Sequence, residues 1–184
     1  MSLAIFENFL EFAEKAVAAK NDLPPAIDPA EFESALVCYG VVLLHSHMEQ
    51  CLRSAIEARC MRCADSEVRA FALSVRDEKA GRIGIGALKD TLRRFSDAYK
   101  TAFRTDLDAS GRADSWESIK NQRITVAHHG QPATCSLLDL RTYYEDIRHI
   151  LGFFCDKLGL NSTEIATISS LIVIAAAPAG AVPP

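Results

Sequence analysis

DPAEFESALVCYGVVLLHSHMEQCLRSAIEARCM, residues 28–61, is the stretch that decides the fold. Asp28 followed by Pro29 is a good helix N-cap and first-turn pair, and after them only Gly40 interrupts a helical pattern that runs to Met61. At ~1.5 Å per residue such a helix spans roughly 45–50 Å. We therefore expect one unusually long helix that forms the backbone of a helical domain.

Helical periodicity continues on both sides of this stretch. Apolar residues recur at intervals of three and four, and polar or proline-containing segments separate the successive runs. Further helices are expected over residues 2–20, 65–79, 85–104, 115–129 and 137–160. Asp114 or Ser115 can cap the fourth of these, and Gly130 with Pro132 can end it. No strand signal of comparable strength exists, so the sequence predicts an all-α bundle of five to six helices.

Length and composition fit a single helical domain over residues 1–184. Hydrophobic residues make up 49% and charged residues 24% of the 184, an ordinary globular balance. An apolar tail covers about residues 165–184, but its apolar run has only about ten residues, against the ~20 that a membrane span needs. The first residues lack the basic region of a secretory signal. We expect a cytoplasmic protein without a membrane span, in which the cysteines stay reduced.

Two short patterns could be taken for ligand sites. Cys60-Met-Arg-Cys63 has the spacing of half a structural zinc site, but no second Cys-x2-Cys or His-x3-His completes it. The glycines of GRIGIG, residues 81–86, lack the spacing and the trailing lysine of a phosphate-binding loop. The sequence therefore predicts no metal and no cofactor.

NQRITVAHHG, residues 121–130, concentrates an arginine and two histidines where a helix should end. On an ideal helix His128 lies about 140° around the axis from Arg123, so the two meet only if the arginine reaches around or the helix stops. The alternative is a solvated arginine with histidines that favour the negative end of the helix dipole, and the spacing alone favours this alternative. The chemistry of an Arg-His pair nevertheless suits phosphate substrates, because histidine can move protons at pH 7 and arginine can grip two oxygens.

SIKNQRITVAHHG, residues 118–130, resembles the Arg-x4-6-His motif of the HEPN superfamily of helical ribonucleases. Arg123, the pair Val126-Ala127 and His128 match that motif. The order of segments around it is similar to RiboL-PSP-like and toxin-type stand-alone HEPN proteins, with a long early helix, a basic helix, the motif and a final long helix. The resemblance covers about residues 28–160, the HEPN-like core.

The resemblance implies a metal-independent endoribonuclease that acts where two copies of the motif helix face each other in a homodimer. The 2′-OH of RNA would attack the phosphate, to give a 2′,3′-cyclic phosphate and a 5′-OH. Arg123 and His128 would be the catalytic residues. The auxiliary candidates, able to supply a further hydrogen bond or proton carrier, are His129, Asn121, Gln122 and Thr125. The implied setting is a toxin–antitoxin or anti-phage system, with RNA as substrate and an antitoxin protein as a further partner.

The charge distribution suggests where RNA could bind. The chain carries a net charge of −4, but residues 76–104 hold eight basic and four acidic residues. On a single helix over residues 85–104, four of the basic residues share one face, and they are the RNA-binding candidates: Lys89, Arg93, Lys100 and Arg104. A solvated face paired with Asp90 and Asp97 is the alternative interpretation.

A rival function remains open at the level of sequence. Ile124 follows the motif arginine, where active HEPN members usually carry Asn, Asp or another polar residue. This position and the acidic balance favour a catalytically inactive HEPN-like module that binds RNA, a nucleotide or a protein partner. In a purely structural bundle the Arg-His pair would be a coincidence.

Overall fold

The computed structural model describes residues 4–79 and 83–161. Those residues form seven α-helices and one short 3-10 turn, without a strand, which confirms the all-α prediction and exceeds the predicted helix count by one. The apolar tail expected over residues 165–184 lies outside the described residues. Within the described ranges, no helix combines the length and the apolar character needed to cross a membrane.

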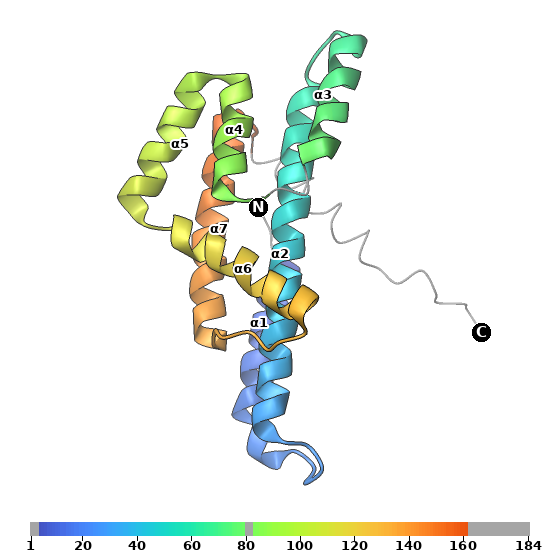
Figure 1. Ribbon diagram of the computed structural model, residues 1–184, viewed down its shortest axis with the longest axis vertical. Coiled ribbons are helices and arrows are strands. Elements are labelled where there is room, and N and C mark those ends of the chain that lie inside the picture. The colour runs from blue at the N-terminus through green and yellow to red at the C-terminus, as the bar shows by residue number, and fades with distance from the viewer. Residues whose placement is uncertain (1–3, 80–82, 162–184) are drawn as a thin grey trace, which may run out of the picture.

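The long second helix organises the bundle (Figure 1). It packs against α1, α3, α6 and α7, while α4 and α5 form a hairpin beside α7 and α6 crosses both α2 and α7. In chain order the elements are α1 (Ala4–Ala18), the 3-10 turn (Lys20–Asp22), α2 (Pro29–Met61), α3 (Ser66–Lys79), α4 (Ile85–Phe95), α5 (Asp97–Ser110), α6 (Ala113–His129) and α7 (Leu137–Lys157).

The predicted start and length of α2 are confirmed. The Asp28 carboxylate accepts a hydrogen bond from the Ala30 amide at 2.8 Å, and Pro29 occupies the first turn. Gly40 lies within the helix without breaking it. A Cβ at that position would come within 2.7 Å of the Phe9 ring and 2.8 Å of a Leu140 methyl. Glycine is therefore needed because α1 and α7 approach the α2 backbone closely at this level.

The single helix predicted over residues 85–104 is wrong. Ser96 adopts an extended conformation, with φ −167° and ψ 137°, and its hydroxyl accepts a hydrogen bond from the Ala98 amide. It thus ends α4 and caps α5, and the two helices turn back on each other (Figure 1). Phe103 is buried against Phe154 of α7, whereas Phe95, at the end of α4, is exposed. The connection expected over residues 105–114, between two predicted helices, is correspondingly shorter, because α5 continues to Ser110.

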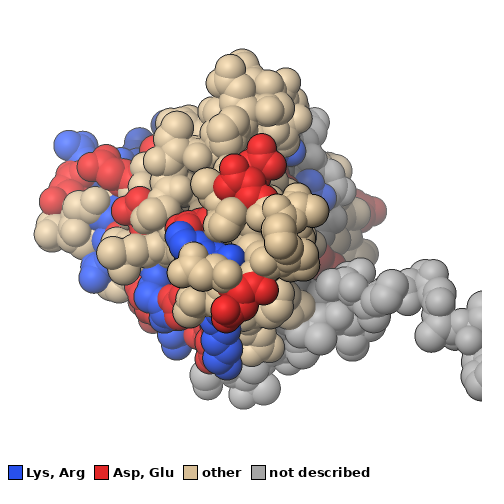
Figure 2. Space-filling model, turned by 90° about the horizontal axis from the view of Figure 1, so that it is seen from below, with Lys and Arg blue, Asp and Glu red and all other residues tan. Residues whose placement is uncertain are grey.

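The break at Ser96 also divides the predicted basic face. Lys89 and Arg93 lie on α4, whereas Lys100 and Arg104 lie on α5, so the four do not share one helix face. Arg93 lies 3.7 Å from Asp90 in an exposed ion pair. On the face shown in Figure 2, Lys and Arg side chains are interspersed with Asp and Glu and form no continuous basic surface.

The start of α6 differs from the prediction, whereas its end agrees with it. The helix begins at Ala113, and neither Asp114 nor Ser115 caps it; the Ser115 hydroxyl instead donates to Asp146 of α7 at 2.6 Å. Trp116 and Ile119 are fully buried, and the Trp116 indole donates to the Ile83 carbonyl. These contacts fix the first half of α6 in the bundle.

The last helix, predicted over residues 137–160, begins at the expected residue and buries one apolar stripe. Ser136 and Asp139 form a capping box at its start, and the Asp139 carboxylate, which accepts from the Ser136 amide and hydroxyl, has a lowered pKa as a result. The residues of this stripe recur at intervals of three and four and are all buried: Leu140, Tyr144, Ile147, Leu151, Phe154 and Leu158. The α7 helix is thus the second long wall against which α6 packs.

Candidate active site at the end of α6

Arg123 and His128 are in direct contact. Nη1 of the arginine lies 2.7 Å from Nε2 of the histidine. The helix includes both histidines and ends at Gly130, which has a left-handed φ of 61°. Of the two routes by which the residues could meet, the first therefore applies: the long arginine side chain reaches around the helix to the histidine.

The contact defines the protonation of the imidazole that takes part in it. A guanidinium has only donors, so Nε2 of His128 must accept, and the proton of the neutral ring lies on Nδ1. The lone pair that a general base would use is therefore occupied by Arg123. A group that draws the guanidinium away would release this lone pair.

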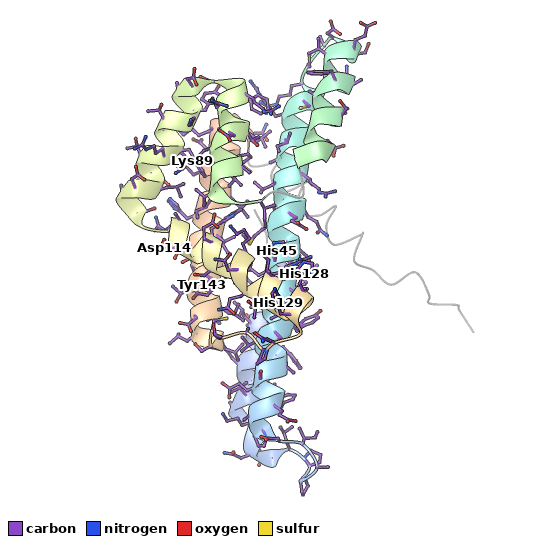
Figure 3. The ribbon with its side chains drawn as sticks, viewed as in Figure 1. His45, Lys89, Asp114, His128, His129 and Tyr143 are labelled. Carbon is purple, nitrogen blue, oxygen red and sulfur yellow. The ribbon has the colours of Figure 1, made fainter. Side chains whose placement is uncertain are left out.

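A third side chain, His45 of α2, belongs to the same region and was not identified from the sequence. Only 7% of its surface is exposed, and Figure 3 shows it where α6 crosses α2, close to the end that carries His128. Burial, and secondarily the charge of Arg123, lowers the pKa of His45 from 6.5 to about 4. The ring is therefore neutral at pH 7 beside the guanidinium.

A second buried histidine lies two residues further along α2. The His47 Nε2 atom has no hydrogen-bond partner within residues 4–79 and 83–161, and burial lowers the pKa of the ring. A sequence signal for His45 did exist. It occupies a position in the apolar stripe of α2 that also contains Val41, Met48 and Leu52. A polar residue in such a stripe usually has a hydrogen-bond partner or a functional role.

The auxiliary candidates differ in what they contact. The Gln122 amide donates to the Thr134 hydroxyl at 2.6 Å and accepts from the Thr134 amide at 2.9 Å, so it holds the segment after α6 against the helix. The Thr125 hydroxyl donates to the Asn121 carbonyl within the helix. The side chains of Asn121 and His129 are exposed. Gln122 and Thr125 thus form local hydrogen bonds, whereas Asn121 and His129 lie at the surface.

A shallow cleft lies between the first turns of α2 and the end of α6. It has a volume of about 560 Å³ and is formed by the first turns of α2, by α6 and by the segment that follows α6. Its lining residues are Ala30, Glu31, Ser34, Ala35, Cys38, Val126, Gly130, Gln131 and Pro132. The Ala133 amide donates to the Cys38 thiol sulfur at 3.3 Å and so ties the two walls together.

The RNA-binding candidates do not surround this site within one copy of the chain. In Figure 3, Lys89 lies on α4, well away from His128 and His129 at the end of α6. Arg104 contacts Asp108 at 3.4 Å on the outer helix of the hairpin. A role for these residues in the same reaction would require an RNA segment that extends across the molecule, or a second copy of the chain.

Comparison of the chain with protein-family models, with curated proteins and with solved structures found no match. Among the described residues, no three His, Cys, Asp or Glu side chains are grouped so that they could hold a metal ion. Arg123, His128 and His45 are therefore the residues from which a function can be inferred.

Proposed function

We propose that the protein is a metal-independent endoribonuclease of the HEPN type. The observation that carries the proposal is the 2.7 Å contact between Nη1 of Arg123 and Nε2 of His128. It brings a fixed cation and a proton carrier together at an exposed helix end. RNA supplies its own nucleophile, so these two functions are the main requirements for cleaving its backbone.

The contact also suggests an order of events. A phosphate of the RNA competes with His128 for the guanidinium donors, because a charged acceptor binds them more strongly than a neutral imidazole. Nε2 is then released and accepts the proton of the 2′-OH as the oxygen attacks the phosphorus. Arg123 holds the charge that grows on the phosphate oxygens. The bond to the 5′-oxygen breaks, and the products are a 2′,3′-cyclic phosphate and a 5′-OH.

His45 is assigned a positioning role. Its neutral ring, buried on α2, adds no second positive charge in the neighbourhood of Arg123. A protonated histidine there would repel the Arg123 guanidinium and push it out of the site. The charge of Arg123 is thus available to the phosphate.

The proposed assembly is a homodimer in which two such helix ends face each other. Asn121, Ile124 and His128 are exposed at intervals of three and four on α6, and 40% of Ile124 is accessible. A face with a central apolar residue suits contact with the same face of a second copy. The histidine of the second copy, in its protonated form, would then donate a proton to the departing 5′-oxygen, while His128 keeps the proton of the 2′-OH. A toxin–antitoxin or anti-phage role, with an antitoxin protein as partner, belongs to the same proposal.

Cleavage of RNA by the purified chain in EDTA tests the proposal. His128→Ala should lower the rate by about 10² or more, because it removes the proton carrier. His129→Ala is the matched control, since the neighbouring histidine is exposed and should cost much less. Equal rates for both variants and the parent chain would show that the assignment of His128 is wrong.

Ile124 supports a second candidate, a catalytically inactive module that binds RNA, a nucleotide or a protein partner. Its exposed apolar side chain lies next to Arg123, where it provides contact surface rather than a hydrogen bond. RNA binding that Arg123→Lys weakens, on a chain that shows no metal-free cleavage, would favour this candidate over the enzyme.

A further inference from the structure

The half of α6 that carries the Arg-His pair is anchored less firmly in the core than the half before it. Trp116 and Ile119 in the first half are fully buried, whereas none of residues 120–129 is buried. The helix ends at the exposed Gly130, and the last turn of a helix frays readily because its carbonyls lack partners further along the helix. The position of this last turn therefore depends on contacts outside the core.

The contact between Arg123 and His128 requires that the last turn stays helical. The two residues are five positions apart, and Nη1 of the arginine lies 2.7 Å from Nε2 of the histidine. Five residues of helix span about 7.5 Å along the axis, whereas the same five residues in an extended chain span up to ~17 Å. Fraying of the last turn would therefore carry the imidazole away from the guanidinium.

Gln122 joins the helix to the chain that follows the last turn. Its Nε2 atom donates to the Thr134 hydroxyl at 2.6 Å, and its Oε1 atom accepts from the Thr134 amide at 2.9 Å. The segment over residues 130–136 turns back past α6 toward α7 (Figure 1), and its Ala133 amide donates to the sulfur of Cys38 on α2 at 3.3 Å. The capping box of α7 holds the far end of the segment. The chain is thus fixed on both sides of the last turn.

We infer that Gln122 is a positioning residue for the Arg123–His128 pair. Its two hydrogen bonds to Thr134 hold the last turn of α6 in the conformation in which the arginine reaches the histidine. Both polar atoms of the Gln122 amide are bound to Thr134, so this residue acts through the pair rather than on the RNA. The effect of Gln122 on cleavage rests on the proposed function, whereas its effect on the geometry of the pair does not.

The nitrogen NMR spectrum of the neutral His128 ring in the full chain tests the geometry, because it distinguishes the two tautomers. In the parent chain the proton should lie on Nδ1, since Nε2 accepts from Arg123. Gln122→Ala removes both hydrogen bonds and should raise the fraction of rings without the arginine contact about threefold to tenfold. Thr134→Val removes only the hydroxyl and should have a smaller effect. Thr134→Ser keeps both groups and should match the parent.

Gln131→Ala is the matched control. This glutamine is exposed in the same segment, and its backbone amide, rather than its side chain, is bound to the Thr125 carbonyl at 3.3 Å. The His128 spectrum of this variant should equal that of the parent. A folded Gln122→Ala chain with the parent's His128 spectrum refutes the positioning role. If Gln122→Ala does not fold, Thr134→Val decides by the same criterion.

Cleavage of RNA in EDTA separates the positioning role from the proposed function. For Gln122→Ala we expect kcat to fall about tenfold or more and KM to change less, because a displaced catalytic group affects the reaction more than substrate binding. If the parent cuts no RNA but Gln122→Ala changes the His128 spectrum, the nuclease is refuted and the positioning role stands. If RNA is cut but the spectrum is unchanged in Gln122→Ala, the positioning role is refuted and the nuclease stands.

Discussion

His45 should make the stability of the fold depend on pH. Its pKa is lowered from 6.5 to about 4 in the folded chain, chiefly by burial. In the unfolded chain the ring takes up a proton as the pH falls below about 6.5, whereas the folded ring stays neutral until about pH 4. Between these values the unfolded state binds more protons. The contribution to stability is therefore complete above pH 6.5 and is lost as the pH falls toward 4.

The size of the effect follows from the two pKa values. Linkage predicts that the free energy of unfolding falls by ~2 kcal/mol between pH 7 and pH 5 through His45 alone. His47, whose pKa is also lowered by burial, adds to the same slope. Glu117 and Asp139 have pKa values lowered from 4.5 and 3.8, so their contributions are lost mainly below this window. Measurements between pH 7 and pH 5 thus report chiefly on the two buried histidines.

Urea unfolding, followed by the fluorescence of the single, fully buried Trp116, measures this slope. His45→Gln should reduce the loss of stability between pH 7 and pH 5 by ~2 kcal/mol, whatever its effect on stability at pH 7. His129→Gln, at an exposed position, is the matched control and should leave the slope unchanged. If His45→Gln has the slope of the parent chain, the lowered pKa of His45 is refuted.

Three further substitutions test the fold and the site. Ser96→Ala should lower stability by about 1 kcal/mol, measured by urea unfolding, because α5 loses its side-chain cap. Gly40→Ala should cost about 1–3 kcal/mol in the same assay, because the new Cβ would meet Phe9 and Leu140 below 3 Å; a neutral result would mean that the three helices separate easily. Arg123→Lys should lower kcat in single-turnover cleavage more than it weakens RNA binding, because it keeps the charge and loses the fork; an effect on binding alone would contradict the catalytic role.

Much of the fold could be predicted because its signals are local. The cap formed by Asp28 and Pro29, and Gly130 at the end of α6, each fix a helix boundary within a few residues of sequence. The break at Ser96 could not be predicted in this way. Phe95 and Tyr99 keep helical spacing across the serine, and only the packing of α5 against α7 shows that the chain reverses there.

The site was predictable only in part, for a related reason. Arg123 and His128 belong to one helix, but the ideal rotation of about 140° between them left their contact open, and the length of the arginine side chain decides it. His45 lies 78 residues before Arg123 in the sequence. Its proximity is a consequence of how α6 crosses α2, which no periodicity within either helix encodes.

Arg123 interacts with one exposed and one buried histidine, so the pKa of the buried His45 should report on what binds to the arginine. It donates to the exposed His128, and its charge helps to keep the buried His45 neutral. A phosphate that binds the guanidinium offsets part of that charge, so the pKa of His45 should rise toward the value that burial alone sets. The NMR titration of the His45 ring should therefore shift to higher pH when inorganic phosphate occupies Arg123, and it should not respond to phosphate in Arg123→Gln. Because His45 is largely buried, this response would reach it through the arginine rather than through direct contact with the ligand.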